Sequence, residues 1–203
     1  MCKLICITNR RLCGDGFLLQ IEKIAAAKPD CIILREKDLD EKAYSELALR
    51  VSEICGRYDV PFSAHYFYKA AIRPGIRRIH LPLYVLRQMS DEEKNSFSVI
   101  GVSCHSADEA REAQRLGASY ITAGHIYRTD CKSGLEGRGL DFLREVKNSV
   151  DIPVFAIGGI SAENAAQTLS AGADGLCIMS GFMNSSDPGK LTAKLREVTG
   201  QDG

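Results

Sequence analysis

The feature that most constrains the fold is a repeating alternation of short apolar runs with longer amphipathic stretches. Most of the apolar runs are continuous and rich in β-branched residues, as expected for strands that are covered on both faces. These runs predict strands at residues 2–8, 31–35, 60–65, 77–80, 98–103, 119–124, 152–157 and 174–178. The amphipathic stretches predict helices at residues 16–27, 41–57, 67–72, 83–88, 107–117, 139–148, 162–171 and 189–198.

Alternating strands and helices predict βα units around a parallel sheet. An open, doubly wound sheet would give the same local pattern, but a count of about eight strands favours closure. No linker, low-complexity tract or long charge run divides the 203 residues. We therefore predict an α/β fold, a single (β/α)8 TIM barrel spanning residues 1–203. Two helices have clear start signals: Ser106 before Ala-Asp-Glu, in the form of a capping box, and Ser161 before Ala-Glu-Asn.

Charge and cysteine content direct the search for function to a pocket. The 26 Lys and Arg residues balance 26 Asp and Glu residues, so we expect neither nucleic acid nor a membrane as a partner. The eight cysteines form no Cys-x-x-Cys pair, which argues against the usual zinc and redox motifs. The apolar start is too short for a signal peptide, and no stretch reaches the roughly 20 apolar residues of a membrane span. We expect a cytoplasmic protein.

In a barrel of this kind the active site lies at the carboxyl ends of the strands. All four histidines, His65, His80, His105 and His125, fall at predicted strand ends. Ser103 and His105 close the fifth strand and are candidates for the pocket floor. Cys104, between them, should point to the opposite face of the strand, which argues against a Cys–His nucleophile.

Two glycine sites suggest phosphate binding. Gly158 and Gly159 follow the seventh strand, and Ser180 and Gly181 follow the eighth. The loops after strands seven and eight hold a phosphate in many barrels. Exposed backbone amides next to a helix N-terminus attract an anion. The alternative is that these glycines only form tight turns.

Candidate catalytic or anion-binding residues with ionisable side chains follow the sixth and the second predicted strands. Residues 124–139 form a long connection that contains His125, whose side chain can titrate near neutral pH. A histidine satisfied by a neighbouring backbone group is the alternative. Lys132 is either an anion partner or a solvated loop residue. Arg35 and Lys37, two residues apart, should point the same way and could hold anionic groups, unless they belong to a surface salt-bridge cluster.

Together, these residues resemble a known family over nearly the whole chain. The shared motifs are Ile-Leu-Arg-Glu-Lys at 33–37, His80-Leu81, Gly-Val-Ser-Cys-His-Ser at 101–106, Gly-Ala-Ser-Tyr at 117–120, Ala-Ile-Gly-Gly-Ile at 156–160 and Ala-Gly-Ala-Asp-Gly at 171–175. With these motifs the chain resembles the thiamin phosphate synthase/TenI superfamily of small (β/α)8 barrels.

Within that superfamily, three segments favour the TenI branch. Synthases carry an Asn-Asp-Arg triplet after strand three, whose Asp helps to hold magnesium, whereas this chain has His65-Tyr66-Phe67. A second magnesium Asp of the synthases corresponds here to Val85. The loss of two carboxylates leaves a hard dication without its oxygen ligands. The loop at residues 124–139 is similar to the TenI loop almost throughout.

The TenI resemblance implies a thiazole tautomerase, an isomerase that works without metal or cofactor. It would shift a proton within a carboxythiazole phosphate to give the aromatic tautomer, with His125 as the catalytic acid and base. The remaining site residues would bind substrate: Arg35, Lys37, His65, His105, Lys132, Gly158, Gly159, Ser180 and Gly181. The triplet at His65 departs from the Asn-Gly-Arg turn common in TenI proteins, so His65 could be a second acid/base group. The resemblance also implies a homodimer.

Other functions compete with this interpretation. The first is a magnesium-dependent thiamin phosphate synthase, which joins a pyrimidine pyrophosphate to thiazole phosphate. The second is a non-catalytic barrel that binds a thiamin-pathway ligand or acts as a regulator. The third is an isomerase for another small phosphorylated metabolite, since fold alone does not fix function.

Overall fold

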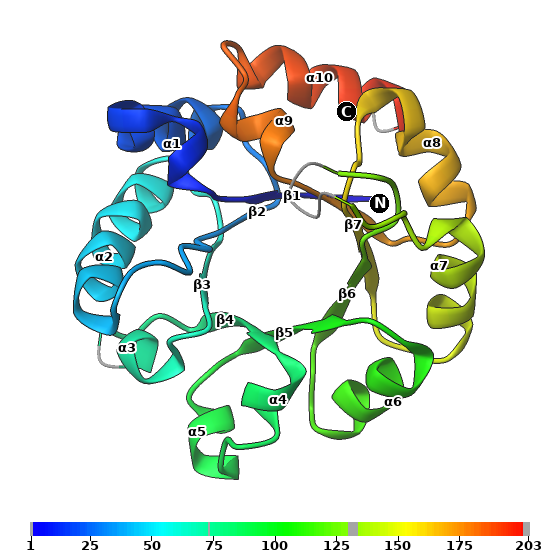
Figure 1. Cartoon of the computed structure of the whole chain (residues 1–203). Coiled ribbons are helices and arrows are strands. Elements are labelled where there is room, and N and C mark those ends of the chain that lie inside the picture. Colours follow the sequence, from blue (N-terminus) through cyan, green and yellow to red (C-terminus); the bar gives the residue numbers. More distant parts are fainter. Residues whose placement is uncertain (1, 73, 130–133, 201–203) are drawn as a thin grey trace.

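The chain folds into a closed barrel of eight parallel strands in sequence order, surrounded by helices (Figure 1). The computed structural model describes residues 2–72, 74–129 and 134–200. The strands are β1 Lys3–Ile7, β2 Cys31–Ile33, β3 Phe62–His65, β4 Arg78–Pro82, β5 Val99–Cys104, β6 Tyr120–Gly124, β7 Val154–Ile157 and β8 Gly175–Ile178. The predicted (β/α)8 barrel is confirmed, and each predicted strand overlaps an observed one.

The helices lie outside the ring of strands (Figure 1). They are α1 Phe17–Ala26, α2 Glu41–Arg57, α3 Tyr68–Ile72, α4 Leu83–Leu86, α5 Asp91–Asn95, α6 Ala107–Arg115, α7 Gly139–Asn148, α8 Ala162–Ser170, α9 Ser180–Met183 and α10 Pro188–Val198. Two short 3-10 turns, η1 Arg10–Leu12 and η2 Gly14–Gly16, follow β1. The helices α5 and α9 were not predicted, because each is about one turn long and too short to show a helical period.

Capping explains where several helices begin. Ser106 accepts a hydrogen bond from the amide of Glu109 at 3.1 Å, but the Glu109 carboxylate reaches the amide of His105 instead of closing the predicted box. At α8 the side chain of Asn164 accepts from the amide of Ser161 at 2.9 Å. The helix α5 begins with a complete capping box between Ser90 and Glu93, a sequence signal that was available and overlooked.

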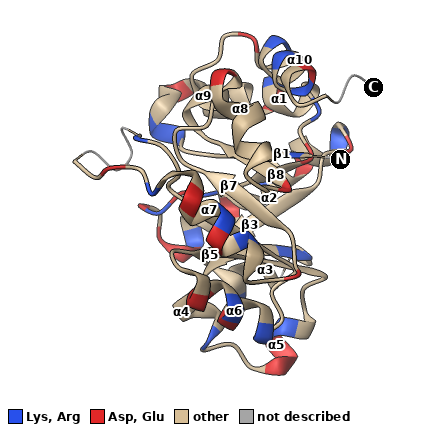
Figure 2. Ribbon diagram, turned by 90° about the vertical axis from the view of Figure 1, so that its right-hand side faces the viewer, with Lys and Arg blue, Asp and Glu red and all other residues tan. Residues whose placement is uncertain are grey.

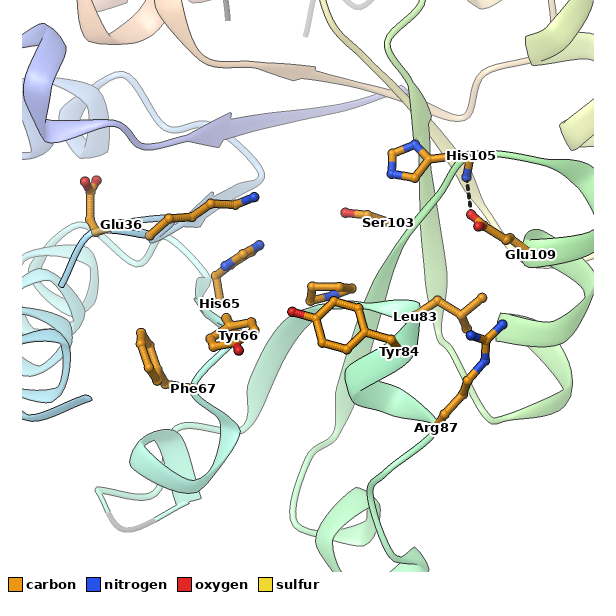
Figure 3. Close-up of a pocket in the computed structure, with 12 residues that line it drawn as sticks. Glu36, His65, Tyr66, Phe67, Leu83, Tyr84, Arg87, Ser103, His105 and Glu109 are labelled. Atoms are coloured by element: carbon orange, nitrogen blue, oxygen red, sulfur yellow. Dashed lines mark hydrogen bonds between the residues drawn. The ribbon is translucent and has the colours of Figure 1, made fainter. Parts of the chain in front are cut away.

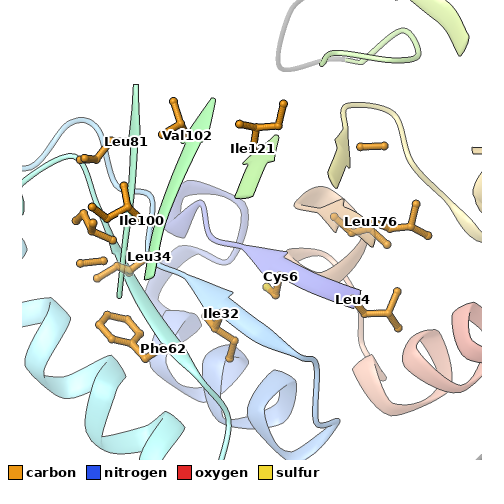
Figure 4. Close-up of a cluster of buried hydrophobic side chains, with 14 of the residues drawn as sticks. Leu4, Cys6, Ile32, Leu34, Phe62, Leu81, Ile100, Val102, Ile121 and Leu176 are labelled. Carbon is orange, nitrogen blue, oxygen red and sulfur yellow. The ribbon is translucent and has the colours of Figure 1, made fainter. Parts of the chain in front are cut away.

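The core has two parts because alternate strand residues point in opposite directions. One set faces the helices and includes Leu4, Cys6, Ile32, Leu34 and Leu176 (Figure 4). The other set fills the barrel interior: Ile5, Ile7, Cys31, Ile33, Tyr120, Phe155 and Cys177. Side chains therefore close the barrel from within, and ligands must bind at an end of it.

Strand register places a row of interior residues side by side on neighbouring strands. His65 pairs with His80, His80 with Gly101, and Gly101 with Tyr120. One step nearer the carboxyl end, Ser103 pairs with Thr122. Both rows face the interior of the barrel, beneath the loops that follow the strands.

Charged residues of both signs are interspersed along the ribbon (Figure 2), in keeping with a formal net charge of zero. Within the described ranges, no helix combines the length and apolar character needed to cross a membrane.

Candidate active site

Two adjoining cavities open at the carboxyl ends of the strands. The inner cavity measures about 270 Å³ and lies between the ends of β2 and β5 to β8, with Thr122, His125, Gly158, Gly159 and Ser180 in its wall. The outer cavity measures about 530 Å³ and lies over β3, β4 and α4. Both are lined by Lys37, His65, Pro82, Ser103 and His105. Together they form one continuous site of the size that small-molecule ligands occupy.

The inner cavity brings together most of the residues predicted from the strand ends: Arg35, Lys37, His65, His105, His125, Gly158, Gly159 and Ser180. Lys132 lies outside the described residues. Gly181 does not line either cavity. Its Cβ position faces Ile178 Cγ2 at 2.9 Å and Leu191 Cδ2 at 3.7 Å, so the absent side chain leaves room for packing beneath α9 and not for a ligand.

His125 lines the inner cavity, although the residue is only 7% solvent-exposed. Among the residues described, neither ring nitrogen of His125 has a hydrogen-bond partner. A buried polar group without a partner is costly, so the ring is poised for a ligand or a water in the inner cavity. Within the described residues, no backbone group hydrogen-bonds the His125 ring.

The glycines after β7 hold the loop that carries His125. Gly158 and Gly159 have φ of +98° and +67°, which glycine adopts without strain. A Cβ on Gly158 would lie 2.3 Å from Cβ of His125. Tyr127 donates its amide hydrogen to the carbonyl of Gly158 at 3.0 Å. The glycines thus serve close packing of two loops and also leave backbone exposed to the cavity.

His105 is fixed from two sides. Its Nδ1 lies 3.1 Å from the carbonyl oxygen of Gly124, so the ring must carry its hydrogen on Nδ1 to donate there. Its amide donates to Glu109 at 2.6 Å, and Arg138 Nη1 donates to its carbonyl at 2.7 Å. In the neutral ring this leaves Nε2 as an acceptor.

His65 and His80 are buried neutral rings. Their ring centroids are 5.9 Å apart and nearly parallel. Burial, with a contribution from Arg35, lowers the pKa of His80 to about 3. Burial first, and then the charges of His80, Arg35 and Lys37, lower the pKa of His65 as well. Neither ring adds positive charge to the site near neutral pH.

The buried carboxylate of Glu36 joins the ends of the first two strands. No role was predicted for this residue from the sequence. Its Oε1 accepts from the hydroxyl of Thr8 at 2.6 Å and from the amide of Arg10 at 3.1 Å. The same Thr8 hydroxyl accepts from the amide of Arg35 at 3.0 Å. The Glu36 carboxylate therefore fixes the backbone that carries Arg35 and Lys37.

The outer cavity has aromatic walls (Figure 3). Tyr66, Phe67 and Tyr84 line it, with Arg87 and Glu109 at its far side. Tyr66 has φ of +68° and is 40% exposed, and Tyr84 is 52% exposed. The rings of Tyr66 and Phe67 meet edge to face, with centroids 5.0 Å apart. Exposed aromatic faces at a cavity suit a planar ring.

The residues present do not fit a magnesium ion bound through carboxylates at the ends of β3 and β4. Tyr66 offers a phenol, and Val85 is buried in the core. The acidic residues on the outer cavity wall are Glu36 and Glu109, and protein donors already engage both. In the part of the chain that the structure describes, no cluster of three His, Cys, Asp or Glu residues could hold a metal.

Fold and site together define the class: a (β/α)8 barrel with a two-part ligand site at the carboxyl ends of its strands. The chain belongs to the thiamine monophosphate synthase family, whose model matches residues 4–182. The superfamily predicted from the sequence motifs is therefore confirmed.

The chain is similar to several named relatives. A thiamine-phosphate synthase of Clostridium acetobutylicum is 33% identical over 189 residues, which cover 90% of this chain and 88% of that one. A thiamine-phosphate synthase of Pyrococcus abyssi is 33% identical over 201 residues, which cover 97% and 94%. The structure of a thiamine phosphate pyrophosphorylase from Pyrococcus furiosus superposes with a TM-score of 0.83 at 29% identity, covering 98% and 96%.

These relatives correct the predicted branch. The Clostridium acetobutylicum and Pyrococcus abyssi relatives are named as synthases, which are transferases, so the expected tautomerase and isomerase function is wrong. That prediction rested on two replaced carboxylates, at residues 66 and 85, and on the resemblance of the loop at residues 124–139 to the TenI loop.

Proposed function

We propose that this chain is a transferase of the thiamine-phosphate synthase type, which joins a pyrimidine pyrophosphate to thiazole phosphate. The names of the relatives support this assignment. The structural observation that carries it is the pair of adjoining cavities with a shared wall. A reaction between two substrates needs two subsites that bring the reacting atoms together.

The inner cavity suits the thiazole phosphate. Gly158 and Gly159 line it just before α8, and Ser180 lines it after β8. Exposed amides near a helix N-terminus favour an anion. The ring nitrogens of His125, which have no hydrogen-bond partner among the described residues, lie in the same wall and can contact the ligand.

The outer cavity suits the pyrimidine pyrophosphate. Tyr66, Phe67 and Tyr84 provide faces against which a planar pyrimidine can stack. Lys37 lines both cavities, and Arg35 lines the inner one. A pyrophosphate between the two rings would thus meet two cations, with neutral His65 beside them.

In the proposed reaction a carbon–nitrogen bond forms between the pyrimidine methylene and the thiazole nitrogen. The carbon–oxygen bond to pyrophosphate breaks, and its electron pair leaves with the pyrophosphate. Arg35 and Lys37 stabilise the negative charge that develops on this leaving group, and they are held in place before the reaction begins. The Glu36–Thr8 contact supplies that preorganisation.

The test is turnover by the purified protein with both substrates, followed by release of pyrophosphate. Lys37→Met should lower the rate by about 10- to 100-fold, the range expected for a charge-assisted hydrogen bond of roughly 1.5–3 kcal/mol. Lys42→Met, on the exposed face of α2, is the matched control and should not change it. Equal rates for both variants would contradict the assignment of Lys37.

One observation favours a second candidate, a barrel that binds these ligands without turnover. Tyr66 and Val85 stand where the synthase pattern carries the carboxylates for magnesium. Under this alternative, thiazole phosphate and pyrophosphate bind to the purified protein but no joined product forms, with or without added magnesium. Product formation would exclude it.

A further inference from the structure

A buried row of polar side chains runs from the barrel interior to the cavity wall. The hydroxyl of Tyr120 lies 3.0 Å from Nδ1 of His80, and Nε2 of His80 lies 2.9 Å from the hydroxyl of Ser103. Tyr120 and His80 are buried, and Ser103 lines both cavities. Tyr120 and His80 therefore line neither cavity, whereas Ser103 lines both.

The row follows from strand register and one glycine. Gly101 pairs with His80 on one side and with Tyr120 on the other. A Cβ on Gly101 would lie 2.3 Å from the Tyr120 hydroxyl and 2.6 Å from Nδ1 of His80. The missing side chain thus leaves the space in which the two rings meet. Ser103, two residues further along β5, points to the same interior side.

The hydrogen-bond directions can be assigned by counting donors and acceptors. In the described part of the chain, His80 Nδ1 is the partner of the Tyr120 hydroxyl. A buried phenol hydrogen needs an acceptor, so Tyr120 donates and Nδ1 accepts. Neutral His80 then carries its hydrogen on Nε2 and donates it to the oxygen of Ser103. Thr122 Oγ1 donates to the same oxygen at 3.4 Å.

Because the Ser103 oxygen accepts from His80 and Thr122, its own hydrogen is left for the cavity. We propose that Tyr120 and His80 are positioning residues that fix the hydroxyl of Ser103 as a hydrogen-bond donor to an anionic oxygen of the bound substrate. The ligand class, a phosphate or pyrophosphate oxygen, rests on the proposed function. The direction of the relay from Tyr120 to Ser103 rests on the hydrogen bonds alone.

The first test is the tautomer of His80, read from the nitrogen-15 chemical shifts of the histidine rings in the wild-type protein. The relay predicts the neutral form with hydrogen on Nε2 near neutral pH. Hydrogen on Nδ1 would overturn the relay, whatever the protein catalyses. In Tyr120→Phe, which removes only the donor, the resonances of His80 should shift toward a mixture of the two tautomers.

The second test is pyrophosphate binding in a double-mutant cycle. Ser103→Ala should weaken binding by about 10-fold or more, as expected for a lost hydrogen bond to a charged group. Tyr120→Phe should weaken it by roughly 3- to 10-fold, although Tyr120 lines neither cavity. The double variant should bind no more weakly than Ser103→Ala, since Tyr120 acts through Ser103. Additive losses, or no loss in Tyr120→Phe, would contradict the relay.

Tyr58→Phe is the control for loss of a phenol hydroxyl, because Tyr58 lies at the end of α2 and contacts Glu22. It should bind pyrophosphate as the wild type does. Failure of the wild type to bind pyrophosphate would contradict the proposed function, and the tautomer of His80 would still decide the relay.

Discussion

The carboxylate of Glu36 and the hydroxyl of Thr8 are 2.6 Å apart and join the carboxyl ends of β2 and β1 at the wall of the outer cavity. The Glu36 residue is only 3% exposed, and burial raises the pKa of its carboxyl group. The contact holds the segment that presents Arg35 and Lys37. A buried acidic group thus supports the site that we propose to bind anions.

Replacing Glu36 tests that support. In Glu36→Ala the amide of Arg10 and the hydroxyl of Thr8 lose their acceptor. We expect the free energy of unfolding in urea to fall by about 1–3 kcal/mol, the cost of unsatisfied buried groups. The KM for the pyrophosphate substrate should rise as well. Glu41→Ala, an exposed position on α2, should change neither, and a matching loss there would contradict the assigned role.

Gly117 and Gly158 both have positive φ but differ in the space around the Cβ position, so they form a matched pair for substitution by alanine. Gly117 has φ of +93° with nothing within 4 Å of its Cβ position, so Gly117→Ala should cost only the backbone strain, about 1 kcal/mol. In Gly158→Ala, at φ of +98°, the new Cβ must also displace His125. Overpacking should add roughly 1–3 kcal/mol and weaken thiazole phosphate binding. Equal losses in the two variants, measured by urea unfolding and calorimetry, would show that the His125 loop is not packed as described.

The free energy of unfolding at acid pH should depend on the two buried histidines, His65 and His80. His80 has a pKa of about 3 in the folded protein against a usual value near 6.5, and that of His65 is also lowered. Between pH 3 and pH 6.5, roughly, the unfolded chain binds a proton at His80 that the folded chain does not. The stability that His80 contributes is therefore present above pH 6.5 and is lost as the pH falls. The slope is about 1.4 kcal/mol per pH unit for each such histidine.

The pH dependence is measured by urea unfolding at about pH 7, 6 and 5. His80→Gln removes one titrating group, so its free energy of unfolding should fall less steeply with acidification than that of the wild type. Parallel curves for the two proteins would show that His80 is already protonated or exposed in the folded state.

The aromatic wall of the outer cavity should contribute to binding of the pyrimidine pyrophosphate and not of the thiazole phosphate. Tyr84 is half exposed at the mouth of that cavity, and an aromatic contact contributes about 0.5–1.5 kcal/mol. Tyr84→Ala should therefore raise the KM for the pyrimidine pyrophosphate by roughly 2- to 10-fold. The KM for thiazole phosphate should stay unchanged and serves as the internal control. An equal change in both would contradict separate subsites.

The barrel could be predicted because strands buried on both faces leave continuous apolar runs in the sequence. The fourth unit differs from its predicted form: β4 continues to Pro82, and the short helices α4 and α5 follow in place of the one helix predicted at residues 83–88. The predicted segment 31–35 is shorter as a strand, and the Leu34 carbonyl accepts from the Tyr44 hydroxyl after β2 ends. Such endings depend on tertiary contacts, which no local pattern records.

The site could be predicted where its residues lie at the carboxyl ends of strands, because barrel active sites form there. That rule placed His125, Gly158 and Ser180 in one cavity wall. It could not show that His80 hydrogen-bonds Tyr120, because the register between strands decides which side chains meet. It also missed the acceptor role of Glu36, which depends on how the loop at Thr8 folds back.

We propose that the two cavities hold two substrates, which the protein joins. The most direct measurement incubates the purified wild-type chain with the pyrimidine pyrophosphate and thiazole phosphate and quantifies thiamin phosphate and pyrophosphate by mass spectrometry, with magnesium and with a chelator. If the protein joins the two substrates, both products form in equal amounts, and neither forms when one substrate is left out. Binding of both substrates without any thiamin phosphate, in either condition, would contradict the proposal.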